Sequence, residues 1–319
     1  MQVHFEVNKL PFISNAVLTI GAFDGVHQGH RIILSQLSKI AASLSGETVV
    51  ITFHPHPRRI LNNAEAPSLL TSLDERISLF STLGIHHLVI IPFNQEFASL
   101  TAEKYIQDFL VQYFKPRAVV VGFDHRFGRN RTGDYQMLEK EGELYGFDVI
   151  EIPEYVLNES KVSSTQIRQA LLSGNIELAN KLLTYPYQLT GTVIEGDKLG
   201  RTIGFPTANL AIMDNDKLIP ASGVYAVRVY REKEKKNLVM NGMMNIGYRP
   251  TVNGRERRIE VHLFNFNEDI YNEQLRVELL FHTRKEMKFS GIDALKLQLE
   301  KDKIEISRLL GQFTEPPLL

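Results

Sequence analysis

A pair of histidines lies at the predicted start of a helix, directly after a predicted strand. The stretch that contains them reads Gly21-Ala22-Phe23-Asp24-Gly25-Val26-His27-Gln28-Gly29-His30. Glycines let a backbone approach a ligand closely, and a helix N-terminus offers unpaired N–H groups and a partial positive charge to a phosphate. Imidazoles at that place can donate hydrogen bonds to phosphate oxygens as charge develops on a leaving pyrophosphate. The stretch therefore predicts a phosphate site, and the alternative is a tight strand–helix turn with incidental histidines.

Further polar clusters follow other predicted strands. The prolines of His54-Pro55-His56-Pro57-Arg58-Arg59 fix a loop that carries basic groups. The loop Gly122-Phe123-Asp124-His125-Arg126-Phe127-Gly128 mixes acid, base and aromatic groups that could read an adenine or a flavin edge. Ser163-Ser164-Thr165-Gln166-Ile167-Arg168 starts a predicted helix and offers hydroxyls, amides and a guanidinium to a polyphosphate. Each cluster alone has an ordinary alternative, a surface turn or an N-cap followed by a solvated arginine.

A glycine-rich stretch in the second half suggests a second phosphate site. Residues 196–209 read GDKLGRTIGFPTAN, so several glycines lie close to a predicted strand, as in a flap over phosphates. Thr207 and Asn209 are two residues apart, and in an extended segment they point to the same side. Their oxygens could hold Mg²⁺ together with nucleotide oxygens. The alternative is a glycine-rich hairpin with polar tips.

A strand glutamate, Glu260, has the chemistry of a general base. A carboxylate near a primary hydroxyl can take its proton as phosphoryl transfer proceeds. A lone glutamate on a strand is more often a solvated, outward residue. His262 lies on the same face as Glu260 by the two-residue period and is given no role.

The first half of the chain alternates strands with helical patterns, which favours a parallel, Rossmann-like α/β sheet covered on both faces. The predicted strands are Ala16–Ile20, Glu47–Phe53, His87–Ile91, Ala118–Val121 and Phe147–Ile152. Ligands bind such sheets at the carboxyl ends of the strands, which is where the first four motifs fall.

The second half contains strand after strand without intervening helices, which favours an antiparallel barrel. These strands are Leu189–Glu195, Val224–Tyr230, Leu238–Ile246, Ile259–Phe264 and Leu275–His282. We interpret the charged run Arg231–Lys236 as a solvated hairpin loop. A final helix that carries Ile292, Leu295, Leu299, Ile306 and Leu309 on one face should pack on the barrel.

Short helices join the two halves. Ser163 and Ser164 can cap a helix that runs through Leu172, and Asn175 can cap another that runs through Leu183. We expect a first domain over residues 1–185 and a second over residues 186–319.

In their order along the chain, these motifs resemble one bacterial enzyme family. GAFDGVHQGH, TFHPHP, GFDHRFG and VSSTQIR resemble the adenylyltransferase module of bifunctional riboflavin kinase/FMN adenylyltransferase, or FAD synthetase. GRTIGFPTAN, PASGVY, NIGYRPT and EVHLFNF resemble its riboflavin kinase module. Two positions depart from the family pattern: His125 stands where an aromatic residue is usual, and Asn272 where a glycine is usual. Asparagine tolerates left-handed backbone angles, so we expect the turn at Asn272 to survive.

The resemblance implies an α/β nucleotidyltransferase domain followed by a riboflavin kinase β-barrel with a C-terminal helix. It implies that riboflavin and ATP give FMN, and that FMN and a second ATP give FAD and pyrophosphate, both steps with Mg²⁺. Two alternatives stay open: a single-activity adenylyltransferase whose barrel only binds, and a flavin- or nucleotide-responsive regulator without turnover.

The resemblance also implies site residues. Catalytic roles fall to Glu260, as the kinase base, and to His27 and His30. Contacts to ATP and its phosphates in the adenylyltransferase are expected from Gly21, Phe23, Asp24, Gly25, Gly29, Gly122, Asp124, Ser164, Thr165 and Arg168. Flavin or phosphate contacts are expected from Pro55, Pro57, Arg58 and Arg126. In the kinase, ATP or flavin contacts are expected from Gly200, Arg201, Gly204, Phe205, Pro206 and Asn245, and Mg²⁺ ligation from Thr207 and Asn209.

The charge balance and the absence of cysteine restrict the classes of partner and cofactor that we expect. The chain has 36 Lys and Arg against 37 Asp and Glu, so no global positive field attracts nucleic acid or anionic lipid. With no cysteine, disulfides, thiolate nucleophiles and Cys-ligated zinc are excluded. We expect small-molecule substrates, no nucleic-acid or membrane partner, and a cytoplasmic location, with a weak homo-oligomer left open.

Overall fold

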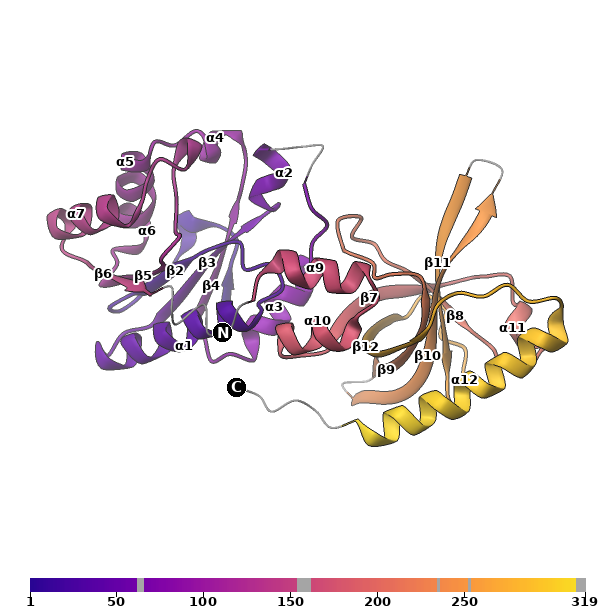
Figure 1. Ribbon diagram of the computed structural model, residues 1–319. Helices are drawn as coiled ribbons and strands as arrows, with labels where there is room; N and C mark the ends of the chain where they lie inside the picture. The colour runs from indigo at the N-terminus through magenta and orange to yellow at the C-terminus, as the bar shows by residue number, and fades with distance from the viewer. Residues whose placement is uncertain (62–65, 154–161, 234–235, 252–253, 314–319) are drawn as a thin grey trace. The chain divides into compact units, whose positions relative to one another are not determined.

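The computed structural model divides into two compact units, Met1–Ser164 and Thr165–Leu319 (Figure 1). It describes residues 1–61, 66–153, 162–233, 236–251 and 254–313. Among these residues, no helix combines the length and apolar composition needed to cross a membrane.

The first unit is built on a parallel sheet with the strand order β1-β4-β3-β2-β5-β6. Its strands are β1 (Gln2–His4), β2 (Val17–Ile20), β3 (Thr48–His54), β4 (His87–Pro92), β5 (Ala118–Gly122) and β6 (Asp148–Ile152). The predicted strands are confirmed, while β1 was not predicted because three residues show no periodicity. From β2 the chain proceeds to β3 on one side and later returns to β5 on the other, so the direction of winding reverses at β2.

The helices of the first unit join these strands. They are α1 (Gln28–Ser43), α2 (Pro57–Leu61), α3 (Leu73–Ser81), α4 (Gln95–Ala98), α5 (Ala102–Lys104), α6 (Gln112–Phe114) and α7 (Tyr135–Tyr145), with a π-helix η2 (Tyr105–Val111) and short 3-10 turns η1 (Val7–Lys9) and η3 (Arg129–Arg131). Crossover helices of this kind are what make adjacent strands parallel.

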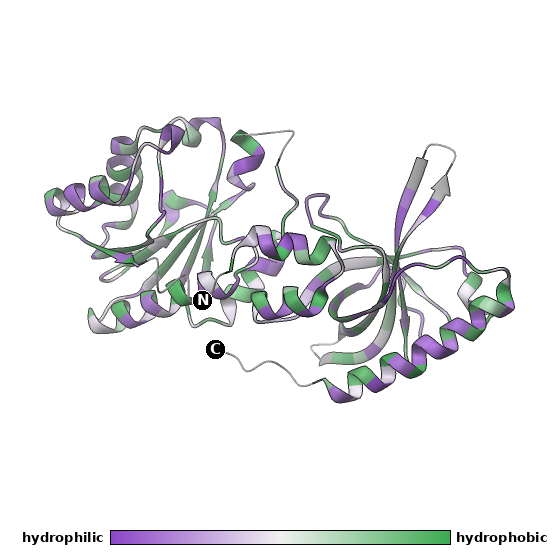
Figure 2. Ribbon diagram, viewed as in Figure 1, coloured by the Kyte–Doolittle hydropathy of each residue, from purple (hydrophilic) through white to green (hydrophobic). Residues whose placement is uncertain are grey.

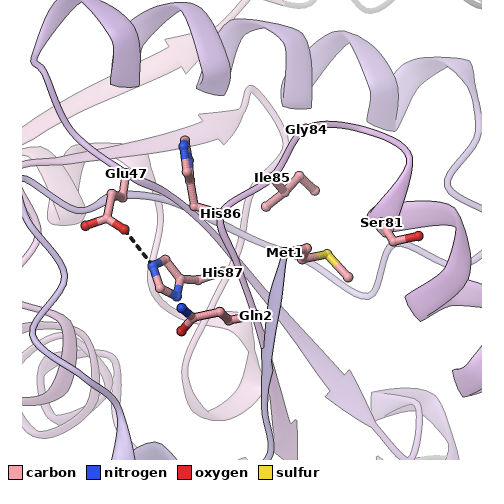
Figure 3. Close-up of a pocket in the computed structure, with 8 residues that line it drawn as sticks. All are labelled: Met1, Gln2, Glu47, Ser81, Gly84, Ile85, His86 and His87. Carbon is pink, nitrogen blue, oxygen red and sulfur yellow. Dashed lines mark hydrogen bonds and ion pairs between the residues drawn. The ribbon is translucent and has the colours of Figure 1, made fainter.

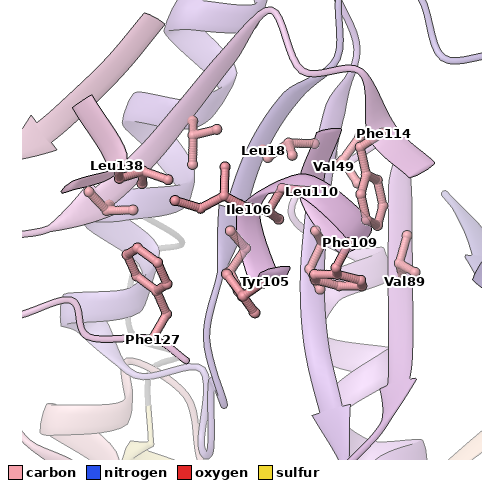
Figure 4. Packing of buried hydrophobic residues seen from close by; sticks show 14 of the residues in the cluster. Leu18, Val49, Val89, Tyr105, Ile106, Phe109, Leu110, Phe114, Phe127 and Leu138 are labelled. Atoms are coloured by element: carbon pink, nitrogen blue, oxygen red, sulfur yellow. The ribbon is translucent and has the colours of Figure 1, made fainter. Parts of the chain in front are cut away.

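Neighbouring residues along each strand pack on opposite faces of the sheet. Leu18 and Ile51 belong to one hydrophobic core, and Val17 and Val50 belong to the other. Figure 4 shows the first core, where side chains of η2 such as Ile106 lie against the sheet. The prediction of a sheet covered on both faces is confirmed.

The second unit contains a closed antiparallel barrel with the strand order β10-β11-β8-β7-β12-β9. Its strands are β7 (Tyr187–Ile194), β8 (Ala208–Ala211), β9 (Gly223–Lys233), β10 (Lys236–Thr251), β11 (Gly254–Leu263) and β12 (Gln274–Arg284). Its helices are α9 (Ser164–Leu172, whose first residue belongs to the first unit), α10 (Ile176–Leu183), α11 (Leu199–Thr202) and α12 (Ile292–Gln312). The predicted barrel is confirmed, as is the cap of α10, where the Asn175 side chain accepts a hydrogen bond from the backbone N–H of Leu178 at 3.1 Å.

The charged run between β9 and β10 corrects one prediction. β9 continues through Lys233, and Arg231 is only 2% exposed rather than solvated. Its guanidinium donates to Glu273 Oε1 at 2.6 Å and to Glu268 Oε2 at 2.7 Å. Carboxylates that come later in the chain therefore allow this arginine to be buried.

Asn272 lies in the turn that precedes β12. It has φ +63°, so the expected left-handed asparagine is confirmed.

The last helix, α12, packs on the barrel as predicted. Ile306 and Leu310 are buried in a core shared with barrel residues such as Val224. Figure 2 shows hydrophobic residues recurring along α12 among hydrophilic ones. Ile292 was expected on the packed face but is 55% exposed in the first turn of the helix, so the packed face begins later.

Candidate active sites

The first candidate site is the loop that leads from β2 into α1. Gly25 has φ +83°, a left-handed conformation that glycine adopts without steric cost. Phe23 and Val26 also have positive φ, +49° and +37°, which is costly for residues with a side chain. The backbone N–H of Val26 donates to the carbonyl of Phe23 at 3.1 Å. Strained backbone of this kind persists only where the surroundings enforce it, and such places are often functional.

The predicted histidine pair lies together at the start of α1. His27 is the N-cap residue, and its ring stacks on that of His30 with centroids 3.8 Å apart. The ring of Phe23 meets His30 edge-on at 5.1 Å. Burial, followed by the nearby His27 and Arg76, holds the pKa of His30 well below its usual value. Nδ1 of His30 is buried and has no hydrogen-bond partner in the part of the chain that the structure describes.

Asp24, a residue of this loop, anchors it to the segment before α3. Its carboxylate is buried and accepts hydrogen bonds from the backbone N–H of Leu70 at 2.9 Å and of Thr71 at 3.2 Å. The backbone N–H of Gly25 donates to the Thr71 hydroxyl at 3.2 Å. These contacts hold the loop in shape, and a contact of Asp24 with ATP stays a prediction.

Arg76 is a residue of this site that no sequence motif indicated. It lies on α3, which begins with a capping box between Ser72 and Glu75. The side chain of Arg76 is 4% exposed and donates to the carbonyls of Ala22, at 2.6 Å, and Phe53, at 3.1 Å. The Ser-x-x-Glu pattern could have predicted the start of the helix, but nothing in the sequence says that this arginine turns inward.

The other predicted clusters of the first unit follow the carboxyl ends of strands that neighbour β2. Pro55, Pro57 and Arg58 come after β3, and Gly122 is the last residue of β5. This placement confirms the predicted edge of the sheet.

Two of the side chains that follow β5 have partners of their own. Arg126 forms an exposed ion pair with Asp134 at 3.1 Å. His125 stacks on Phe127 with centroids 5.8 Å apart, and burial lowers its pKa to about 4. Contacts of these individual residues with ligands stay predictions.

The serine-rich motif lies at the boundary of the units. Ser164 is the last residue of the first unit, and its hydroxyl donates to the carbonyl of Asp24 at 3.2 Å. Thr165 and Arg168 follow on α9 in the second unit. Their part in phosphate binding stays a prediction.

The second candidate site lies on the barrel, where three strands bring polar residues side by side. Glu260 on β11 is paired in register with Asn209 on β8 and with Asn245 on β10. Directly opposed residues on neighbouring strands share one face of the sheet. A cavity of about 280 Å³ is lined by Glu260 and Asn245 together with Thr207, His262, Met243 and Phe289.

The electrostatic surroundings of Glu260 suit a proton acceptor. Burial, with a smaller contribution from Asp197, raises the pKa of Glu260, while Arg258 and Arg249 oppose the rise. Asp197 is itself paired with Arg258, whose Nη1 lies 2.7 Å from Oδ2, and with Arg249. A carboxyl with a raised pKa binds a proton more tightly once it has accepted one.

The glycine-rich stretch passes through α11 and approaches the site. A Cβ on Gly200 would collide with the carbonyl oxygen of Phe205, so the turn requires glycine at this position. Arg201 pairs with Asp269 at the surface at 3.5 Å. The next carbonyl, that of Pro206, lies 2.8 Å from Nδ1 of His262, which thereby connects this stretch to β11.

Thr207 and Asn209 follow as the predicted metal ligands. Asn209 lies close to Gly196, where a Cβ would collide with its side-chain amide. In the described part of the chain, no group of three or more His, Cys, Asp or Glu side chains could hold a metal ion. A cation held by neutral oxygens here would need further ligands from substrate phosphates, which is the usual way in which enzymes bind Mg²⁺.

A further pocket lies at the opposite, amino-terminal edge of the sheet and contains none of the predicted site residues. It is lined by Met1, Gln2, Glu47, Ser81, Gly84, Ile85, His86 and His87 (Figure 3). Nε2 of His87 lies 2.9 Å from Glu47, and Nδ1 of His87 lies 3.0 Å from Nε2 of His4. No motif in the sequence pointed to this cluster.

Comparison with known proteins agrees with both halves of the chain. A family model for FAD synthetase matches residues 10–166, and one for riboflavin kinase matches residues 183–310. The bifunctional riboflavin kinase/FMN adenylyltransferase of Escherichia coli (strain K12) is 39% identical over 300 residues, which are 94% of each chain. The enzyme of the same name from Bacillus subtilis (strain 168) is 38% identical over 306 residues, again 94% of each chain.

A solved structure is also similar over the whole length. It is described as a macrolide-efflux protein from Streptococcus pneumoniae, and it has a TM-score of 0.82 and 32% identity. The match covers 98% of this chain and 99% of that chain. With its histidine-bearing α/β unit and its glutamate-bearing barrel, the chain belongs to the bifunctional riboflavin kinase/FMN adenylyltransferase family.

Proposed function

We propose that the barrel unit transfers a phosphoryl group from ATP to riboflavin, and that the α/β unit transfers an adenylyl group from a second ATP to the FMN produced. The first step releases ADP and the second releases pyrophosphate. The observation that supports this most is that each unit carries a polar site of its own, one around His27 and His30 and one around Glu260.

In the kinase step, Glu260 accepts the proton of the primary hydroxyl of riboflavin while the hydroxyl oxygen attacks the γ-phosphorus of ATP. Its position in the cavity and its raised pKa support this role. Asn245, its neighbour on β10, can orient the substrate through its amide. The Gly200–Phe205 turn, in which the backbone N–H of Phe205 donates to the carbonyl of Gly200 at 2.8 Å, supports a role of its backbone groups in binding the phosphates.

Thr207 and Asn209 are the residues that would hold Mg²⁺ on the barrel. Their oxygen donors fit a small, hard cation that keeps several ligands from phosphates and water. When bound, the ion neutralises charge on the phosphates of ATP.

In the adenylyl transfer, a phosphate oxygen of FMN attacks the α-phosphorus of ATP, and the bond to the pyrophosphate oxygen breaks. His27 and His30 donate hydrogen bonds to the phosphates, and the N-terminus of α1 contributes its partial positive charge. Among the basic candidates, Arg168 ranks first as an additional phosphate ligand, ahead of Arg58, Arg59 and Arg126.

One incubation tests the function. Purified protein is mixed with riboflavin, Mg²⁺ and ATP, and the flavins are separated by chromatography over time. We expect FMN to appear first and FAD to follow. FMN without FAD would leave only the kinase. If neither product forms, a second incubation with FMN and ATP distinguishes the remaining alternatives: FAD would leave only the adenylyltransferase, and no FAD would favour the regulator. A cytoplasmic location and weak self-association stay predictions.

A further inference from the structure

Arg76 is a buried cation whose hydrogen bonds go to neutral partners. Its side chain is 4% exposed, and it donates to the carbonyls of Ala22 and Phe53. Its Nε is buried without a hydrogen-bond partner among the described residues. Burial lowers the pKa of Arg76, but a guanidinium stays protonated at neutral pH. Burying such a charge costs folding free energy, which indicates that Arg76 is buried next to the loop for a functional reason.

The two carbonyls that accept hydrogen bonds from Arg76 lie at the ends of adjacent strands. Ala22 belongs to the loop after β2, and Phe53 is the residue before the last of β3. The carbonyl of Ala22 also accepts a hydrogen bond from the Thr52 hydroxyl at 3.1 Å. Arg76 therefore fixes where the loop leaves the sheet, directly upstream of the histidines that begin α1.

The charge of Arg76 also acts on the histidine pair. Burial contributes most to disfavouring protonation of the His30 ring, followed by His27, the N-cap residue of α1, and then by Arg76 on α3. Asp24 in the loop is the carboxylate that faces Arg76 and partly offsets its charge. The site thus holds the permanent positive charge of Arg76 close to the stacked imidazoles of His27 and His30.

We propose that Arg76 is a positioning residue for adenylyl transfer, which holds the Gly21–His27 loop in its phosphate-binding shape and thereby sets the position of His30. This inference rests on the proposed role of His30 in that step. A neutral imidazole donates a hydrogen bond from only one of its two nitrogens, so the tautomer of His30 determines which nitrogen can donate to the phosphates.

Two substitutions separate the geometric from the electrostatic part. Arg76→Lys keeps the charge but loses the planar fork that reaches both carbonyls, and Arg76→Gln loses both. We expect kcat for FAD formation from supplied FMN to fall on the order of 10-fold to 100-fold in both variants, as for a misplaced reacting group. We expect only Arg76→Gln to raise the pH at which His30 titrates, followed by NMR of labelled histidine and by the pH profile of kcat. FMN formation, measured on the same preparations, should stay at the parental rate because it takes place on the other unit.

The control is Arg117→Gln. Arg117 is a half-exposed arginine of the same unit, 3.6 Å from Asp148, and it lies just before β5 at the other edge of the sheet. It should keep the parental rate and pH profile.

Parental kcat and an unmoved His30 titration in both Arg76 variants would overturn the inference. If Arg76→Gln does not fold, Arg76→Lys decides alone, and it must show the loss in kcat for the inference to stand. A His30→Ala variant separates the two levels: if it forms FAD at the parental rate while the Arg76 variants are slow, the proposed role of His30 fails but the positioning of the loop stands.

Discussion

At the scale of single residues, burial moves the two central titratable groups in opposite directions. It raises the pKa of Glu260 and lowers that of His30, because burial disfavours whichever form of a group carries charge. Both changes move the group toward its uncharged form. In the carboxyl this strengthens a proton acceptor, and in the imidazole it leaves a neutral hydrogen-bond donor.

Replacing Glu260 tests its role as the kinase base. Glu260→Gln keeps the shape of the side chain but cannot accept the proton, so we expect kcat for FMN formation to fall by about 10²-fold to 10⁴-fold. Conversion of supplied FMN to FAD should persist. Glu300→Gln, at an exposed position on α12 of the same unit, is the matched control and should change neither rate. Equal loss of both activities in a folded Glu260→Gln protein would reject a kinase-specific base.

The pH dependence of FMN formation follows from the same carboxyl. Glu260 acts as a base only when it is ionised, so activity should be lost as the pH falls through its pKa. Because that pKa is raised, the acid limb should lie above the ordinary value for glutamate, 4.5. A profile of kcat/KM against pH in riboflavin measures it. An acid limb at or below the ordinary value would show that Glu260 is not the group that titrates.

The residues that the sequence indicated differ in kind from those it did not. Gly25, His27 and Glu260 lie in motifs whose spacing already implies a loop, a helix start and a strand face. Arg76 has no such motif, because its role depends on carbonyls of Ala22 and Phe53 that only the folded sheet brings to one place. Sequence patterns predict which residues share an element, and they do not predict which distant backbone groups a side chain will reach.

At the scale of elements, the strands could be predicted because alternation and strand length reflect local packing. The exceptions have physical reasons. β1 is too short to show a period, and its pairing with β4 is non-local. Arg231 was interpreted as solvated because its partners, Glu268 and Glu273, lie about 40 residues further on. β8 was not listed among the predicted strands because it is only four residues long and begins inside the glycine-rich stretch, of which only Thr207 and Asn209 were expected in an extended segment.

The attachment of α12 to the barrel can be tested through one ion pair. Asp302 is buried and accepts hydrogen bonds from Arg284 on β12 at 2.6 and 3.0 Å and from Gln298 at 2.8 Å. Asp302→Asn leaves the largely buried Arg284 without its counter-charge, so we expect the barrel unit to lose about 3 kcal/mol of unfolding free energy. Urea unfolding followed by circular dichroism measures this loss.

The control for this variant lies on the same helix. Glu305 pairs with Arg308 on the exposed side of α12, and Glu305→Gln should leave the unfolding midpoint unchanged because surface pairs contribute little. Equal midpoints for the Asp302→Asn protein and the parent would mean that α12 is held by its apolar contacts alone.

At the scale of the whole molecule, each unit has its own hydrophobic packing and its own polar site. The two cores of the first unit cover the two faces of the parallel sheet, and a core of the second unit lies between the barrel and α12. The order of motifs along the chain indicated this division, since all motifs of one kind precede all motifs of the other. Riboflavin must then gain its phosphate on one unit before FMN can react on the other.

A mixing experiment tests this separation most directly. His30→Ala should make FMN but little FAD from riboflavin, and Glu260→Gln should make FAD only from supplied FMN. Mixed in equal amounts with riboflavin, Mg²⁺ and ATP, the two variants should form FAD that neither forms alone, because FMN released by the first is adenylylated by the second. If the mixture forms no FAD while each protein keeps its remaining activity, the two sites do not work independently and the proposed division of the two reactions is wrong.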